Sequence, residues 1–147
     1  MQRISPETIA RMAAYQDQLA EAERQGAARL AEAFARAPKG LGVHEIDRGT
    51  HIVRVNDEEL ALLGYTREEM VGRPSLEFIV MSETAERAIS RKLSEQVELK
   101  PLVRSFKRKD GSAIPLVLLD RHLRNAAGEV VGLRTVLTSA EGALAEG

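Results

Sequence analysis

The stretch IVRVNDEELALLGYTREEMVGR, residues 52–73, decides the fold because it places one strand before two short helices that are capped separately. The β-branched residues over 52–55 favour a strand. Asn56 suits the capping position of the helix that follows, and Gly64 suits the left-handed position that ends it. A Thr-x-x-Glu capping box at 66–69 then begins a second short helix. The segment therefore predicts strand, helix, helix within a small space.

Strand-like segments lie on both sides of this stretch. Upstream, residues 41–47 and 51–55 are separated by Arg-Gly-Thr and indicate a hairpin. Downstream, a helix predicted over 82–97 leads into three strand-like segments, with Asp-Gly and Asn-to-Gly turn signals between them. These segments are 99–107, 113–123 and 129–138. Five antiparallel strands, with short helices inserted after the second, predict an α+β domain.

The later strands carry apolar residues on both faces. Ile114, Leu116 and Leu118 share one face of their strand, whereas Val117 and Leu119 share the other. A sheet with one face in water would show a clean alternation of apolar and polar residues. We therefore expect both faces to be covered. The inserted helices cover one face, and the N-terminal segment or a partner subunit covers the other.

Residues 6–37 predict a long amphipathic helix before the sheet. Ser5 suits its N-cap, and Pro-Lys-Gly at 38–40 ends it. Such a helix would be about 45 Å long, which exceeds the width of a small domain. Apolar or small residues recur at steps of three or four along one stripe: Ile9, Met12, Tyr15, Leu19, Ala22, Gly26, Leu30 and Ala33. This stripe either packs on its own domain or forms a two-stranded coiled coil between subunits, and the length favours the coiled coil.

Composition excludes several classes of protein. The chain has 147 residues and nearly balanced charge, with 21 basic and 22 acidic side chains, which argues against a nucleic-acid partner. It has no cysteine, so disulfides, thiolate metal sites and cysteine nucleophiles are excluded. No run reaches the roughly 18 apolar residues of a membrane span, and residues 1–4 do not open a signal peptide. Without a catalytic motif either, we expect a cytoplasmic domain that is not an enzyme and has no membrane partner.

Two segments of the sequence resemble the signature of PAS sensory domains, namely residues 52–56 and 63–73. Lys-Asp-Gly at 109–111 and the segment 128–132 are similar to the later hairpins of that family. The resemblance implies a five-stranded antiparallel sheet that curls around a small cavity. It also implies a role in bacterial signal transduction, for example in two-component systems, often as a dimer. We divide the chain into an N-terminal amphipathic or coiled-coil helix, a PAS domain and a C-terminal tail or linker, covering residues 1–38, 39–139 and 140–147.

The resemblance also indicates which residues face the cavity. The candidates are Ile52, Leu60, Leu63, Phe78, Ile89, Leu93, Phe106, Leu116, Leu118 and Arg134. All except Arg134 are apolar, and they suit a filled core as well as a ligand pocket. The Arg134 side chain either lies outward along the sheet or is a buried guanidinium. If buried, it needs an acidic ligand or a carboxylate such as Glu77, because an unpaired buried charge is costly.

We expect no cofactor in this cavity. Without cysteine, neither a covalent flavin adduct nor a coumarate-type chromophore can form. Haem-binding members usually ligate iron through a histidine of the long helix, and residues 82–98 contain none. We interpret His44, His51 and His122, which lie in strand-like segments, as surface or turn residues. Non-covalent flavin is not expected either, because the inward positions of the later strands are apolar and there is no tryptophan.

The predicted function is that of a sensor or relay domain that dimerises and binds a small ligand. The alternative is a ligand-free PAS-like module for protein–protein interaction. Either function implies a second copy of the chain and a downstream signalling protein or fused output domain as partners. PAS domains often end in Asp-x-Thr-Glu before an output helix, whereas here residues 136–141 keep Thr138 and lack the first acid. The chain is either a module of a longer protein or a stand-alone domain.

Overall fold

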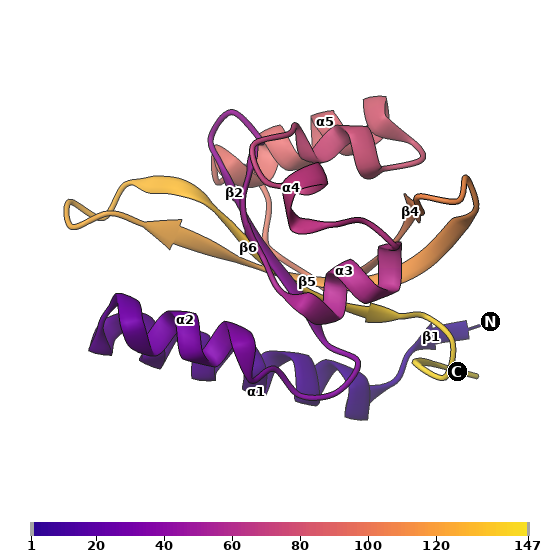
Figure 1. The fold of residues 1–147 in the computed structure, drawn as a ribbon, viewed down its shortest axis with the longest axis horizontal. Helices are drawn as coiled ribbons and strands as arrows, with labels where there is room; N and C mark the ends of the chain where they lie inside the picture. The colour runs from indigo at the N-terminus through magenta and orange to yellow at the C-terminus, as the bar shows by residue number, and fades with distance from the viewer. Residues whose placement is uncertain (1, 147) are drawn as a thin grey trace.

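Strands from residues 42–55 and strands from residues 102–139 belong to one antiparallel sheet. The computed structural model describes residues 2–146. The five strands are β2 (Gly42–Asp47), β3 (Ile52–Val55), β4 (Leu102–Lys107), β5 (Ala113–Arg124) and β6 (Val130–Ser139). Their order across the sheet is β3-β2-β6-β5-β4, and helices lie on both faces (Figure 1). The predicted α+β class and strand pairing are confirmed.

The inserted helices form where the capping signals indicated. They are α3 (Asp57–Leu63), α4 (Arg67–Met70), the 3-10 helix η1 (Ser75–Phe78) and α5 (Ser82–Leu93). The Asn56 side chain accepts a hydrogen bond from the backbone N–H of Glu59, and Gly64 ends α3 with a φ of 83°. Thr66 and Glu69 complete the predicted capping box of α4. The end of α5 was predicted at 97, but the helix ends at Leu93.

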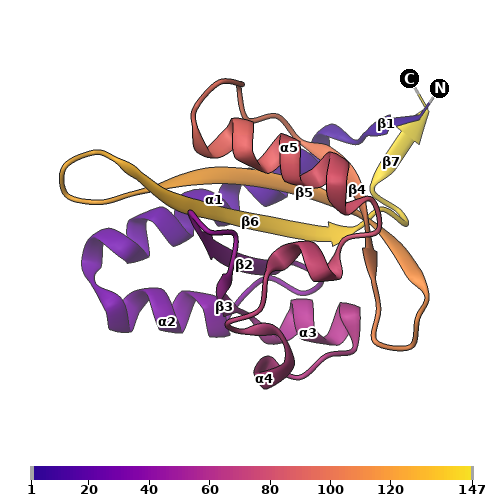
Figure 2. The same cartoon turned by 90° about the horizontal axis from the view of Figure 1, so that it is seen from above.

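The N-terminal amphipathic helix is present, but it ends at Gln25 and does not reach residue 37. Residues 6–37 form two helices, α1 (Pro6–Gln25) and α2 (Ala27–Ala35), separated by Gly26 with φ 130° and ψ 170°. The two helices lie side by side and run in opposite directions (Figures 1 and 2). Because the chain reverses direction at Gly26, Leu30 and Phe34 of α2 lie against the sheet, where both are buried. The Tyr15 hydroxyl donates to the carbonyl of Ala33, 2.8 Å away, and joins the two helices.

The apolar stripe of these helices packs on the chain's own sheet. Met12, Tyr15, Leu19 and Leu30 are buried there, and Ile9 is half-buried. The four buried residues pack with Val43, Val117, Leu119 and Val136. Packing on its own domain, the alternative to a coiled coil, is therefore the arrangement in the structure. The stripe proposed for a coiled coil is already occupied by the sheet, so it offers no seam to a second chain.

The C-terminal segment, interpreted from sequence as a tail or linker, is part of the fold. Leu144–Glu146 form strand β7, which pairs antiparallel with β1 (Gln2–Ile4) in a separate two-stranded sheet. The backbone N–H of Ser5 donates to the carbonyl of Ala143, 2.8 Å away, so the pairing continues to the start of α1. Sequence reasoning missed these strands because three-residue segments carry no periodic signal.

The sheet separates two apolar cores, as the sequence of the later strands predicted. The inner core, between the sheet and the inserted helices, contains Leu63, Leu116 and Leu133 among its fully buried members. The outer core lies between the sheet and the N-terminal helices. Gly132 lies where β2 and β6 come close, because a Cβ atom there would meet the carbonyl oxygen of Ile46 at 2.0 Å. None of the described helices has both the length and the apolar character needed to cross a membrane.

Candidate functional site

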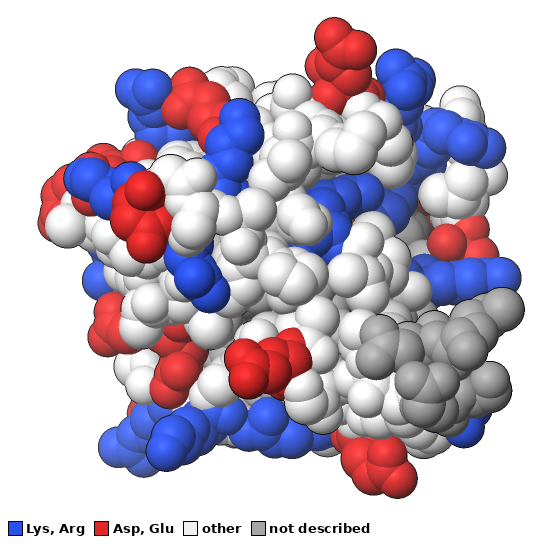
Figure 3. Space-filling model, turned by 90° about the vertical axis from the view of Figure 1, so that its right-hand side faces the viewer, with Lys and Arg blue, Asp and Glu red and all other residues white. Residues whose placement is uncertain are grey.

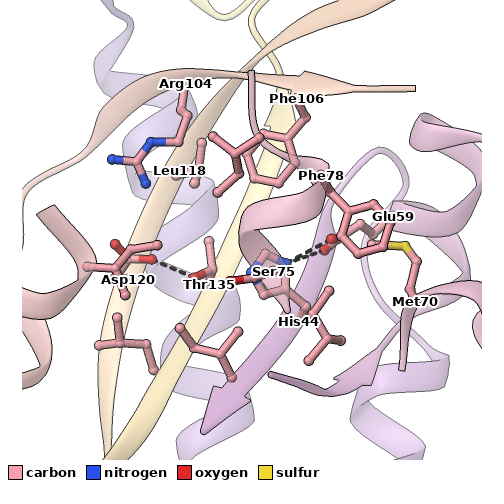
Figure 4. Close-up of a pocket in the computed structure, with 15 residues that line it drawn as sticks. His44, Glu59, Met70, Ser75, Phe78, Arg104, Phe106, Leu118, Asp120 and Thr135 are labelled. Atoms are coloured by element: carbon pink, nitrogen blue, oxygen red, sulfur yellow. Dashed lines mark hydrogen bonds and ion pairs between the residues drawn. The ribbon is translucent and has the colours of Figure 1, made fainter. Parts of the chain in front are cut away.

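A small cavity lies between the sheet and the inserted helices, at the place where the resemblance predicts one (Figure 4). Its volume is about 20 Å³. Five of the predicted residues line it, namely Ile52, Phe78, Ile89, Phe106 and Leu118. Four others, Leu60, Leu63, Leu93 and Leu116, belong to the surrounding inner core without lining the cavity.

Arg134 is the predicted cavity residue that lies on the wrong face. Neighbouring residues of a strand point to opposite faces, and Leu133 and Thr135 line the cavity, so Arg134 points toward α1. Its guanidinium donates to Glu45 at 2.8 Å and to Glu23 at 2.7 Å. Of the two alternatives for Arg134, the buried guanidinium with carboxylate partners is the arrangement in the structure.

The prediction that Glu77 pairs with Arg134 was wrong. Glu77 instead pairs with Arg73 on the surface, at 2.9 Å. Sequence proximity did not reveal the true partners, because Glu23 and Glu45 come from elements distant in the chain.

The cavity also contains a buried ion pair that sequence reasoning missed. His44 of β2 lies with its Nδ1 atom 2.8 and 2.9 Å from the two carboxylate oxygens of Glu59 on α3. Both residues are buried, so the interpretation of His44 as a surface residue was wrong. Burial alone would lower the pKa of His44, but the charge and hydrogen bond of Glu59 raise it above its ordinary value.

A second buried ion pair ties α5 to the sheet. Lys92 of α5 donates to one oxygen of Asp120 on β5 at 2.6 Å, and the Thr135 hydroxyl donates to the other at 2.5 Å. Figure 4 shows Asp120 and Thr135 side by side at the cavity wall. The other two histidines lie outside this group. His122 has its Nε2 atom 2.8 Å from the carbonyl of Lys92, and His51 is exposed at the turn between β2 and β3.

Besides the Nε2 atom of His44, two donor groups at the cavity make no hydrogen bond within residues 2–146. The Ser75 hydroxyl is buried and makes no hydrogen bond. Arg104 of β4, which is half-buried, makes no side-chain hydrogen bond or ion pair within residues 2–146. Burial lowers the pKa of Arg104, and the charge of Asp120 opposes this effect. In Figure 4, the Arg104 guanidinium lies on the same side of the cavity as Asp120.

The size and side chains of the cavity limit its chemistry. A volume of about 20 Å³ holds about one water molecule, whereas sites for drug-sized ligands measure roughly 300 Å³ or more. A flavin or haem ring does not fit the side chains as they lie. Within the described residues, no group of three histidine, aspartate or glutamate side chains is arranged to hold a metal ion. Neither His44 nor Asp120 hydrogen-bonds to Ser75, so the cavity shows no nucleophile paired with a base.

The face drawn in Figure 3 carries side chains of both signs of charge. Lysine and arginine are interspersed there with aspartate and glutamate. Basic atoms also lie recessed between uncharged side chains near the middle of this face. Such a mixed surface differs from the basic stripe that a nucleic-acid groove presents.

Comparisons with known proteins agree with the fold. A family model described as a PAS domain matches residues 40–139. The PAS domain of an HTR-like protein from Haloarcula marismortui is 22% identical, with a TM-score of 0.62 over 84% of this chain and 96% of its own. The PAS domain of a protein from Colwellia psychrerythraea is 18% identical, with a TM-score of 0.64 over 74% of this chain and 92% of its own.

A further similar structure is a PAS domain in complex with ethanol, from a LuxR-family transcriptional regulator of Burkholderia thailandensis. It is 24% identical, with a TM-score of 0.57 over 72% of this chain and 93% of its own. Comparison with curated protein sequences finds no match. The family match spans β2 to β6 and the inserted helices, which are the elements that enclose the cavity. This chain belongs to the PAS domain family.

Proposed function

We propose that this chain is a sensor domain in which a small molecule in the cavity changes the sheet, and the sheet passes the change to the N-terminal helices. PAS domains are generally sensory or interaction modules and not enzymes. The similar PAS domain from Burkholderia thailandensis is in complex with ethanol, a molecule of two carbon atoms. A ligand of that scale would need only a modest enlargement of a partly polar cavity that holds about one water molecule.

The observation that carries the proposal is a direct connection between the cavity and α1. On the cavity face, the Thr135 hydroxyl donates to Asp120. On the opposite face, the Gln16 side-chain amide donates to the carbonyls of Leu119 and Arg134, each at 2.9 Å. These carbonyls belong to the peptide groups that precede Asp120 and Thr135. The same two peptide groups therefore carry the cavity pair and the anchor of α1.

Two further features make this connection sensitive to movement. Gln16 is buried, and turning its amide around would place its oxygen against the two carbonyls and break both hydrogen bonds. Arg134 adds a second link, because it joins Glu23 of α1 to Glu45 of β2. A shift of β5 against β6 would strain these bonds. A buried polar group that loses its partner costs about 1–3 kcal/mol, enough to alter the population of the docked helix.

The test perturbs the cavity and observes α1. Thr135→Val keeps the shape of the side chain and removes the hydrogen bond to Asp120. We expect amide exchange in α1 to become about two- to tenfold faster, because a lost hydrogen bond costs about 0.5–1.5 kcal/mol. Tyr65→Phe is the control, because it removes a hydrogen bond to the carbonyl of Lys107 on the side of the sheet that faces away from α1.

The same comparison in a Gln16→Met background separates coupling from general loosening. If Gln16 carries the coupling, Thr135→Val has a smaller effect on α1 in that background. An α1 that responds equally to Thr135→Val and Tyr65→Phe, or equally with and without Gln16, would refute the relay.

A second candidate function is a ligand-free interaction module, and the small cavity volume favours it. This candidate requires association with a second copy or another signalling protein. Light scattering on the full chain measures self-association. An N-terminal truncation is unsuited to this test, because residues 6–35 supply one side of the outer core.

A further inference from the structure

We infer that the molecule recognised by the cavity is a small carboxylate, bound by Arg104 with help from the Ser75 hydroxyl. This inference rests on the proposed ligand-binding function and adds the chemical class of the ligand. It follows from the hydrogen bonds left unmade at the cavity, from the balance of its charges and from its size.

The cavity is lined by hydrogen-bond donors that have no partner within the described part of the chain. The Glu59 carboxylate lies against His44, and the Asp120 carboxylate accepts from Lys92 and Thr135. The polar groups of the lining that make no hydrogen bond within residues 2–146 are the Ser75 hydroxyl, the Arg104 guanidinium and the Nε2 atom of His44. A guanidinium can only donate, and a serine hydroxyl can donate as well as accept. A complementary ligand therefore presents acceptor atoms, and a carboxylate presents two of them in the geometry that arginine matches.

The charges lead to the same class of ligand. The two carboxylates, Glu59 and Asp120, are each already paired with a basic side chain. Arg104 is an additional positive charge without a bonded counter-ion. Asp120 attracts it, but both oxygens of that carboxylate already accept hydrogen bonds. Burial removes part of the water around this charge, so a bound anion would replace interactions that the guanidinium has lost.

The volume limits the ligand to a compact one. The enclosed space holds about one water molecule, and Met70, which is fully buried in its wall, is an adaptable side chain that can turn to enlarge it. A carboxylate with two or three carbon atoms can place its charged end on Arg104 and its apolar end against Leu118 and Phe106 nearby. Met70, on the opposite side of the cavity in Figure 4, leaves room for these side chains to shift. Larger ring systems would require movement of whole elements.

The experiment uses acetate as the probe and ethanol as its neutral counterpart. Thermal unfolding of the full chain is followed while sodium acetate replaces sodium chloride at constant ionic strength, and calorimetric titration gives Kd. We expect a saturable rise of Tm with acetate. Arg104→Gln should weaken acetate binding about tenfold or more, because it removes a charge-assisted pair. Arg104→Lys, which keeps the charge, should bind acetate with intermediate affinity.

Two variants control for indirect effects. Arg87→Gln removes the same charge from the exposed side of α5, and it should leave the Kd for acetate unchanged. Ser75→Ala should weaken acetate binding several-fold while leaving Tm without acetate unchanged, since this hydroxyl has no partner to lose.

The outcomes separate the inference from the proposed function. If acetate gives no saturable shift, or if Arg104→Gln binds it as tightly as the unchanged chain, the inference is overturned. If ethanol stabilises the chain and acetate does not, the cavity binds a small molecule of another class, so the inference fails and the sensor function stands. The exchange experiment on α1 tests that function independently of any ligand.

Discussion

The buried pair of Lys92 and Asp120 tests how the inserted helices are held on the sheet. The Lys92 and Asp120 side chains are 9% and 5% exposed, and the atoms Nζ and Oδ2 are 2.6 Å apart. Lys92→Met leaves Asp120 with the Thr135 hydroxyl as its remaining side-chain donor. We expect this variant to lose about 3–5 kcal/mol of unfolding free energy, because a buried charge loses its counter-ion. At roughly 2–4 °C per kcal/mol for a chain of this size, Tm should fall by about 6–20 °C.

Urea denaturation followed by circular dichroism at pH 7 measures this loss. The double variant Lys92→Met/Asp120→Leu contains neither charge and should recover most of the stability, since apolar replacements of a buried pair are often neutral. Arg121→Met is the matched control, because Arg121 pairs with Asp17 on the surface and should cost less than about 1 kcal/mol. A Lys92→Met variant within 1 kcal/mol of the unchanged chain would refute the reasoning.

Three further predictions concern the other contacts across the sheet. The pKa of His44 is raised in the folded chain, so the stability from its pairing with Glu59 is complete below the ordinary pKa of 6.5 and is lost as pH rises through the folded value. Glu59→Gln should therefore cost more unfolding free energy at pH 6 than at pH 9, and a cost independent of pH would contradict this. Gly132→Ala should lower Tm by about 4 °C or more, because its Cβ would press on the Ile46 carbonyl. A calorimetric Tm within 1 °C of the unchanged chain would show that β2 and β6 can move apart at this point without cost. Deletion of residues 1–38 should expose the outer core and give an aggregated or dye-binding protein, and a stable, soluble fragment would show that the PAS domain folds without these helices.

The local features of this fold could be predicted because their signals lie within a few residues. Asn56 caps the start of α3 and Gly64 ends it, and the Thr66–Glu69 box begins α4. Each depends on geometry within about four residues, which sequence displays directly. The five-stranded antiparallel sheet was implied by the resemblance, and the element order agreed with it.

The remaining features depend on contacts between distant segments. The energetic cost of Gly26 inside a helix, about 1 kcal/mol, does not decide whether the helix continues. The burial of Leu30 and Phe34 on the sheet decides it, and sequence does not show that surface. His44 was misplaced for the same reason, since its partner Glu59 comes from another element. Arg134 is different, because strand alternation groups it with Val136 on the outer face, and that signal was available in the sequence.

The pairing of β1 with β7 has a mechanical consequence for a chain that is pulled from its two ends. The outermost pair of this small sheet is Gln2 with Glu146, and the strands are antiparallel. Tension between the ends would therefore peel the strands apart one pair at a time, which requires less force than shearing several bonds at once. The last bond to open would be that of Ser5, at the first turn of α1. This joint would yield before the five-stranded sheet, and its opening would free the start of the helix that Gln16 anchors.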